Sequence, residues 1–252
     1  MNHDGSDDSS RNAARAEVER ASANYYYSAT QQGIDARTKR LVQGRCEPFL
    51  KGPRVLDLGW VDANWTDAAL SRGARVDIVE GATRHAHRAR EHYAGQGDVR
   101  VFHSLFQEFV PDSTYDTVIA GDMLRYMPDD VGFLRTVHDR WLEPVGHLIV
   151  TVPNQRSLHR RIGALMGMEN RPEILNSRDR DVGNQRSYDR YGLRDVLQQA
   201  GFRIVELRGC FLKPLSSMQM QEWSDDLLRA FFEMGNELED YCWFLYALAT
   251  RP

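Results

Sequence analysis

Short apolar runs alternate with segments of helical spacing along most of the chain. The predicted strands cover residues 54–58, 75–80, 99–103, 116–120, 146–152, 202–207 and 243–250. The predicted helices among them cover residues 64–71, 83–94, 129–142, 191–200 and 222–238. Strands that alternate with helices in this way predict a mostly parallel sheet, and the last of these strands is expected to close it.

The chain before residue 52 is predicted to stand outside the sheet. Residues 1–22 open with Asp, Ser and Asn and have no apolar pattern, so we expect a disordered tail there. Apolar positions at helical spacing follow between about 33 and 50, and this helix is expected to lie across the open ends of the strands. The predicted organisation is a tail (1–22), a helical lid (23–51) and one domain (52–252).

Composition narrows the class of protein. The 252 residues are 42% hydrophobic and carry a net charge of −4, which suits a single globular domain without the basic surface of a nucleic-acid binder. No apolar run approaches the roughly 20 residues of a membrane helix, and no signal-peptide core is present, so we expect a cytoplasmic protein that does not bind membranes. Cys46, Cys210 and Cys242 lack CxxC spacing, and no residue cluster has metal-ligand spacing, so we expect reduced thiols and no metal.

The first strand ends in a turn that suits a nucleotide-like ligand. Asp57-Leu58-Gly59 begins like a glycine-rich dinucleotide loop, but only the first of the three usual glycines is present. Glu80 ends the second strand roughly 20 residues later, where a carboxylate accepts hydrogen bonds from ribose hydroxyls. The alternative is an ordinary strand–helix–strand unit with a glutamate at its surface.

Longer runs carry a resemblance to a known family. These runs are Val152-Pro153-Asn154, Ser157-Leu158-His159-Arg160, Met166-Gly167, Phe211-Leu212-Lys213-Pro214-Leu215-Ser216 and Glu239-Asp240-Tyr241-Cys242. From about Tyr25 onward the chain resembles the class I methyltransferases that use S-adenosyl-L-methionine, and within them a bacterial subgroup that modifies sugars and small natural products. The resemblance implies a Rossmann-like α/β fold: a seven-stranded, mostly parallel sheet with helices on both faces and an antiparallel closing strand.

The resemblance also assigns cofactor contacts. Glu80 would hold the ribose hydroxyls, the stretch around Leu105 would grip adenine, and Asp122 would border the methionine amino group. Phe106 also suits a core position, the tyrosines near residue 26 suit aromatic anchoring of the lid, and Arg37 or Arg40 suits either the cofactor carboxylate or a surface salt bridge. The implied cofactor-binding residues are Tyr27, Arg37, Asp57, Gly59, Trp60, Glu80, Gly81, Ser104, Leu105, Phe106, Gly121 and Asp122.

The implied catalytic residues are Tyr26, Tyr126 and His159. Relatives usually carry histidine at the position of Tyr126, and tyrosine, with a pKa of about 10, is a poor general base at pH 7. An amine attacks through its own lone pair and needs no base, so Tyr126 favours N-methylation, in which it orients the acceptor. His159 begins a helix, where capping or solvation is the alternative to catalysis.

The predicted enzyme is thus an S-adenosylmethionine-dependent methyltransferase of secondary metabolism, such as antibiotic biosynthesis, with a small polar acceptor. Asn184 and Gln185 are expected in the acceptor wall, where amides suit hydroxyl or amide groups. One alternative is O-methylation of a sugar hydroxyl. Another is a non-catalytic binding protein that lost the cofactor through Trp60, Val61 and Ala63. Homo-oligomerisation is left open.

Overall fold

The computed structural model describes residues 4–27, 33–168 and 174–252. Within these residues it forms a seven-stranded sheet of order β3-β2-β1-β4-β5-β7-β6. The strands are β1 (Arg54–Leu58), β2 (Arg75–Glu80), β3 (Val99–His103), β4 (Tyr115–Gly121), β5 (Leu142–Pro153), β6 (Arg203–Cys210) and β7 (Phe244–Thr250). β1 to β5 pair in parallel, whereas β7 runs antiparallel to both β5 and β6. The predicted Rossmann-like fold with an antiparallel closing strand is confirmed.

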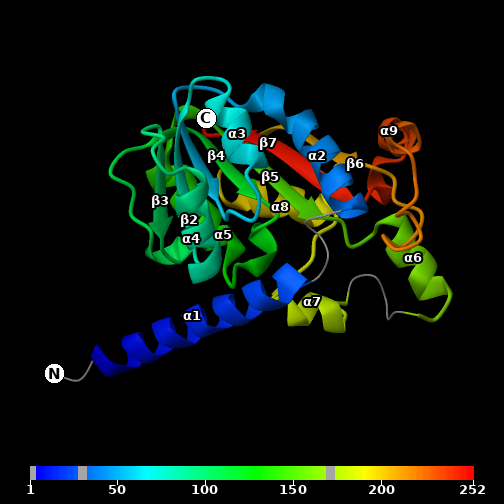
Figure 1. Cartoon of the computed structure of the whole chain (residues 1–252), viewed down its shortest axis with the longest axis horizontal. Helices are drawn as coiled ribbons and strands as arrows, with labels where there is room; N and C mark the ends of the chain where they lie inside the picture. The colour runs from blue at the N-terminus through cyan, green and yellow to red at the C-terminus, as the bar shows by residue number, and fades with distance from the viewer. Residues whose placement is uncertain (1–3, 28–32, 169–173) are drawn as a thin grey trace.

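Helices cover both faces of the sheet (Figure 1). The helices of the described residues are α1 (Asp4–Tyr27), α2 (Ile34–Cys46), α3 (Asn64–Leu70), α4 (Thr83–His92), α5 (Asp130–Thr136), α6 (Leu158–Leu165), α7 (Ser177–Asp181), α8 (Arg190–Gln199) and α9 (Asp225–Met234). Side chains of α2, α3, α4 and α9 join one hydrophobic core, and side chains of α5 and α8 join the other. None of the helices among the described residues is long and apolar enough to span a bilayer.

The two cores follow from the alternation of side chains along each strand. In β1, Leu56 and Leu58 are fully buried in the α5–α8 core, while Val55, just before Leu56, faces the α2–α9 core. Successive residues of a strand point to opposite faces, so a strand covered on both sides becomes apolar throughout. This is why the apolar runs of the sequence located the strands well.

The N-terminal segment differs from its prediction. Residues 4–22, expected to be disordered, belong to α1, and this helix lies at the carboxyl ends of the parallel strands (Figure 1). The segment lacks an apolar stripe, but its Ala, Arg and Glu residues have high helix propensity. Polar contacts hold it: Arg15 Nη2 donates to Glu108 Oε2 over 2.9 Å, and Gln185 Nε2 donates to Glu17 Oε1 over 3.0 Å.

The helix predicted as a lid lies elsewhere. α2 ends at Cys46, a short 3₁₀ turn (Glu47–Phe49) follows, and Ile34, Val42 and Cys46 are buried against the sheet. α2 is therefore a layer of the domain, and the position across the strand ends belongs to α1. The boundary at residue 22 between tail and lid is not a structural boundary, because α1 runs through it.

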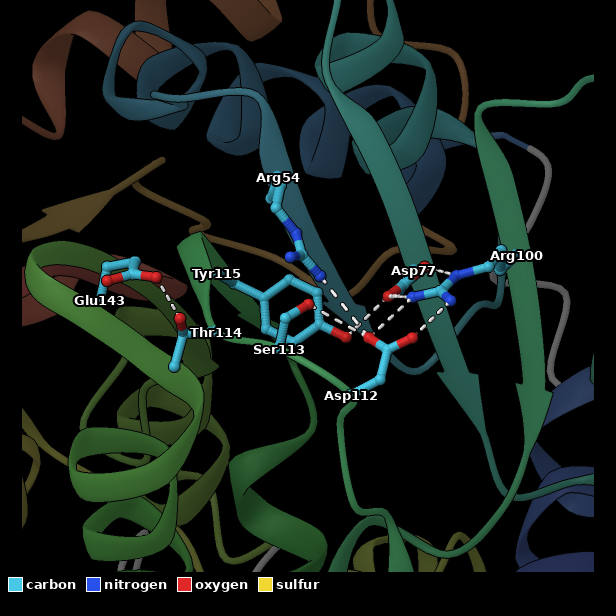
Figure 2. Close-up of polar contacts among 8 residues, drawn as sticks. All are labelled: Arg54, Asp77, Arg100, Asp112, Ser113, Thr114, Tyr115 and Glu143. Atoms are coloured by element: carbon cyan, nitrogen blue, oxygen red, sulfur yellow. Dashed lines mark hydrogen bonds and ion pairs between the residues drawn. The ribbon is translucent and has the colours of Figure 1, made fainter.

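A polar network ties the strands together near their amino ends (Figure 2). Asp77 of β2 is 6% exposed and accepts hydrogen bonds from Arg100 Nε over 2.7 Å and from the Tyr115 hydroxyl over 2.7 Å. Arg100 also pairs with Asp112, which lies 3.6 Å from Arg54. The network joins β1, β2, β3 and β4 at the edge opposite the strands' carboxyl ends.

Candidate active site

A cavity of about 250 Å³ opens at the carboxyl edge of the parallel strands, where α/β folds bind their ligands. The ends of β1, β2 and β4, the loop after β3, and the helices α1 and α2 all contribute to its wall. The predicted site residues that line it are Gly59, Glu80, Gly81, Leu105, Phe106, Gly121, Asp122 and Tyr126. The fold thus brings together residues that are far apart in the sequence.

The turn after β1 keeps one glycine for a conformational reason. Gly59 has φ of +87°, in the left-handed region that favours glycine. Trp60 does not line the cavity: its ring is 3% exposed and packs against His92 and Tyr93, with ring centroids 5.9 and 6.2 Å away. Of Trp60, Val61 and Ala63, the residues expected to weaken cofactor binding, Val61 lines the cavity and the other two do not.

Glu80 presents a buried carboxylate at the end of β2. Its Oε2 accepts the backbone N–H of Trp60 and its Oε1 accepts that of Ala82, both over 2.7 Å. Burial raises the pKa of Glu80 to about 7, although these hydrogen bonds oppose the shift. Each carboxylate oxygen keeps a further lone pair, so the geometry suits two ribose hydroxyls.

His85 lies beside Glu80, with Nδ1 4.0 Å from Oε2. Burial and the nearby Arg88 and Arg84 lower the pKa of His85 to about 4, so the imidazole is neutral at pH 7. Its Nε2 lies 3.3 Å from the Ser22 hydroxyl of α1. His85 is thus a neutral polar contact to α1 rather than a counter-charge to Glu80.

Two predicted cofactor residues support the wall from behind it. Asp57 is 1% exposed and accepts the Thr66 hydroxyl over 2.8 Å, and burial raises its pKa to about 7. The Ser104 hydroxyl donates to the carbonyl of Leu105, and its backbone N–H donates to the carbonyl of Glu80 over 3.1 Å. Neither residue lines the cavity, whereas Leu105 does.

Three charged side chains meet at the end of β4. Asp122 Oδ2 lies 3.2 Å from Lys39 Nζ and 3.1 Å from Arg125 Nη2. The same Nη2 donates to the Tyr126 hydroxyl over 2.7 Å. Asp122 has φ of +60°, and its backbone N–H donates to the carbonyl of Thr151 over 2.8 Å. Arg125 therefore links the carboxylate of Asp122 to the phenol of Tyr126.

The sequence did not predict Lys39 as a site residue, and Arg37 was expected to contact the cofactor instead. The guanidinium of Arg37 pairs with Asp225 of α9, its Nε donating over 2.9 Å, and does not line the cavity. Lys39, Val42 and Gln43 are the α2 residues in the wall. Their spacing of three and four residues puts them on one helix face, a signal that was present in the sequence.

His159 is also not brought to the cavity. Its backbone N–H donates to the carbonyl of Lys213 over 3.1 Å, and it lies at the start of α6. Burial and the nearby Lys213 lower the pKa of its imidazole to about 3, which makes it a weak base at pH 7. The geometry gives no support to a catalytic His159. The side chains of Tyr26 and Tyr27 lie outside the described part of the chain.

α1 supplies a wall that the sequence did not suggest. Its residues Ala14, Glu17, Val18, Ala21 and Ser22 line the cavity. Of the two amides expected in the acceptor wall, Gln185 lines the cavity and bonds Glu17. Asn184 is 8% exposed and donates to Asp179 Oδ1 over 3.1 Å, outside that wall.

Comparison with known proteins identifies the family. Residues 26–207 match the family model described as a methyltransferase domain, so the chain belongs to that family. No curated protein matches the chain. S-Adenosyl-L-methionine, the predicted cofactor, is the methyl donor that the family and the fold support.

Solved structures share the fold at low identity. An S-adenosylmethionine-dependent methyltransferase from Mesorhizobium loti is 19% identical, with a TM-score of 0.59 over 84% of this chain and 98% of that one. A methyltransferase from Thermotoga maritima is 18% identical, with a TM-score of 0.63 over 95% and 100%. The N-methyltransferase NodS from Bradyrhizobium japonicum, solved with S-adenosyl-L-homocysteine, is 14% identical, with a TM-score of 0.57 over 95% and 98%.

The residues present fit such a cofactor. Glu80 offers buried acceptor atoms for a ribose, and Asp122 Oδ1 is buried and has no hydrogen-bond partner among the described residues. A methionine ammonium would satisfy that oxygen, and Lys39 beside it suits the carboxylate. Leu105 and Val18 provide the apolar surface that an adenine needs.

Proposed function

We propose that this methyltransferase transfers a methyl group from S-adenosylmethionine to an amine of a small polar acceptor. The proposal rests on one observation: Gly59, Glu80 and Gly121, at the ends of three strands, and Tyr126, from the loop after β4, line the same cavity. The sulfonium supplies an electrophilic methyl group. The residues of the chain contribute binding, orientation and exclusion of water.

The residues have separate tasks in this proposal. Glu80 binds the ribose, and Lys39 with Asp122 binds the charged end of the methionine part. α1 covers the cavity with Val18 and Ala21, which excludes water from the reacting groups. Methyl transfer is an in-line displacement, so holding donor and acceptor in line accounts for much of the acceleration.

The environment of Tyr126 favours an amine acceptor. Its phenol oxygen accepts a hydrogen bond from Arg125 over 2.7 Å and has a second lone pair that suits an N–H of the acceptor. The guanidinium of Arg125 next to the phenol disfavours a protonated amine there, which leaves the nucleophilic form. The name of NodS as an N-methyltransferase agrees with this assignment, although 14% identity carries only the fold.

O-methylation of a sugar hydroxyl is the second candidate, because Glu17 and Gln185 offer polar atoms to a hydroxylated acceptor. An alcohol benefits from a general base. The histidine in the described wall, His85, contacts Ser22 and lies beside Glu80 rather than beside Tyr126. This position favours the amine over the alcohol.

The physiological setting is part of the proposal. A polar, partly enclosed acceptor site suits a small natural product, as in secondary metabolism, better than a macromolecule. Cys46, Cys210 and Cys242 are buried free thiols, which suits the reducing cytoplasm.

Calorimetry followed by turnover tests the proposal. We expect S-adenosyl-L-homocysteine to bind, and labelled methyl groups to pass to amines in a panel that pairs each amine with its hydroxyl analogue. Transfer to the hydroxyl members alone would replace the amine assignment by O-methylation. The absence of binding heat at about millimolar ligand, where a Kd of 1 mM corresponds to about −4.1 kcal/mol, would overturn the enzyme assignment and favour a non-catalytic protein.

A further inference from the structure

α6 exposes apolar residues that the described part of the chain does not cover. Leu158, Ile162 and Leu165 of α6 and Met166 of the following turn recur at helical spacing, and none of the four is fully buried. Leu165 is 89% exposed and Met166 is 67% exposed. An isolated helix of this length is not stable in water, and an amphipathic helix normally buries its apolar side.

Exposed apolar residues also occur on the elements next to α6. The loop after β6 contacts α6 where the N–H of His159 meets the carbonyl of Lys213, and it contacts α9 where the N–H of Leu212 meets the carbonyl of Phe231. Figure 1 shows α6, this loop and α9 at the same end of the molecule. The exposed apolar residues there, named the α6–α9 face below, are Leu165, Met166, Leu215, Met218, Leu227 and Met234.

Opposite charges flank the two ends of the α6–α9 face. On the α6 side, Arg161 lies four residues before Leu165 and stacks over the ring of Tyr241, 4.9 Å from its centroid. On the α9 side, Asp226 precedes Leu227 and Glu233 precedes Met234, and all four are exposed. Asp226 and Glu233 are seven residues apart, as are Leu227 and Met234, so each pair lies on one face of α9. The two acids therefore border the two apolar residues.

We propose that the α6–α9 face binds a second copy of this chain across a twofold axis. A twofold interface brings the same surface of both copies together and must be self-complementary. Apolar side chains in the middle with a basic flank at one end and an acidic flank at the other meet this requirement. Each copy's α6 then lies against α9 of its partner.

The charge pattern argues against an anionic membrane as the occupant. A membrane-binding helix pairs an apolar side with uniformly basic residues, because the lipid surface is negative. Asp226 and Glu233 would face that surface and be repelled from it. The same acids are favourable opposite Arg161 of a second copy.

Sedimentation velocity of the full chain at several concentrations tests the proposal. We expect a concentration-dependent dimer, and at least a tenfold weaker dimer for Leu165→Glu and for Met218→Glu. Val110→Glu is the matched control, because Val110 is 85% exposed but lies outside the α6–α9 face. A monomer at every concentration, or a dimer that both substitutions leave intact, would overturn the proposal.

Charge exchange provides a second, more specific measurement. Arg161→Glu places acids at both ends of the α6–α9 face, and the double substitution Asp226→Arg with Glu233→Arg makes the α9 end basic, so each variant alone should be monomeric. An equal mixture restores opposite charges at both contacts of the twofold pair, so we expect heterodimers. Thermal unfolding confirms that each variant is folded, and a mixture that stays monomeric contradicts the twofold arrangement. None of the face residues lines the cavity, so binding of S-adenosyl-L-homocysteine should be unchanged in every variant.

Discussion

The backbone N–H of Trp60 donates a hydrogen bond over 2.7 Å to Oε2 of Glu80. This bond joins the turn after β1 to the end of β2, and it uses the main chain of Trp60 while the ring packs elsewhere. A turn with a single glycine can therefore still position the carboxylate that we propose binds the ribose. The loss of the other two glycines matters less here, because the cofactor has no pyrophosphate that needs several bare N–H groups.

Glu80→Ala should weaken binding of S-adenosyl-L-homocysteine by about 1–3 kcal/mol, the usual cost of losing hydrogen bonds to a charged group. Isothermal titration calorimetry measures the change. Glu91→Ala is the matched control: Glu91 lies on α4, its side chain is 67% exposed, and its loss should leave affinity unchanged. Unchanged affinity in Glu80→Ala would remove Glu80 from the site.

Deprotonation of Glu80 and Asp57 should lower the stability of the cofactor-free protein as the pH rises from about 4 to about 7, while the lowered pKa values of His85 and His159 act in the opposite direction. Burial raises the pKa of Glu80 from 4.5 to about 7 and that of Asp57 from 3.8 to about 7. The folded state therefore holds these protons more tightly than the unfolded chain, and deprotonation opposes folding. In urea unfolding across this interval, Glu80→Gln and Asp57→Asn should therefore become more stable relative to the parent protein as the pH rises. A slope equal to that of the parent protein in both variants would contradict the buried-acid explanation.

The centre of the sheet was predictable because β1, β4 and β7 are covered on both faces and are therefore largely apolar, whereas the edge strands β3 and β6 expose residues such as Arg100 and Arg203. α1 was not predictable, because its stability comes from helix propensity and from contacts such as Arg15 with Glu108, which are 93 residues apart. The same limit applies to the site. Glu80 and Gly59 follow from local turns, whereas the pairing of Lys39 with Asp122 depends on how α2 packs against the sheet.

Tyr126→Phe should lower kcat about 2- to 12-fold, the equivalent of one hydrogen bond of about 0.5–1.5 kcal/mol. If Tyr126 only orients the acceptor, Tyr126→Phe should keep the high-pH limb of the pH–rate profile. Tyr191→Phe is the matched control, since Tyr191 is 57% exposed on α8. Disappearance of the limb in Tyr126→Phe alone would show that the phenol transfers a proton.

Asp77→Ala should lower the free energy of unfolding by about 2–3 kcal/mol, because it leaves the Tyr115 hydroxyl and Arg100 without their buried acceptor (Figure 2). Asp98→Ala breaks an exposed pair with Arg75 and should cost less than about 1 kcal/mol. Urea unfolding compares the two. Equal losses would show that the Asp77 network adds nothing beyond a surface ion pair. Cofactor affinity should stay constant, because the network lies at the opposite end of the strands.

Glu19→Ala should speed the release of S-adenosyl-L-homocysteine. Ala82 precedes α4 and has no side chain that can cap it, and Glu19 of α1 takes that role by accepting the Thr83 N–H over 2.8 Å. α1 covers the cavity, so weakening this contact should open it more often. Losing a hydrogen bond of about 1.4 kcal/mol corresponds to a tenfold faster release, measured by stopped-flow displacement. Arg20→Ala, one residue further along and 70% exposed, should leave the rate unchanged. An equal rate in Glu19→Ala would mean that the ligand leaves without displacement of α1.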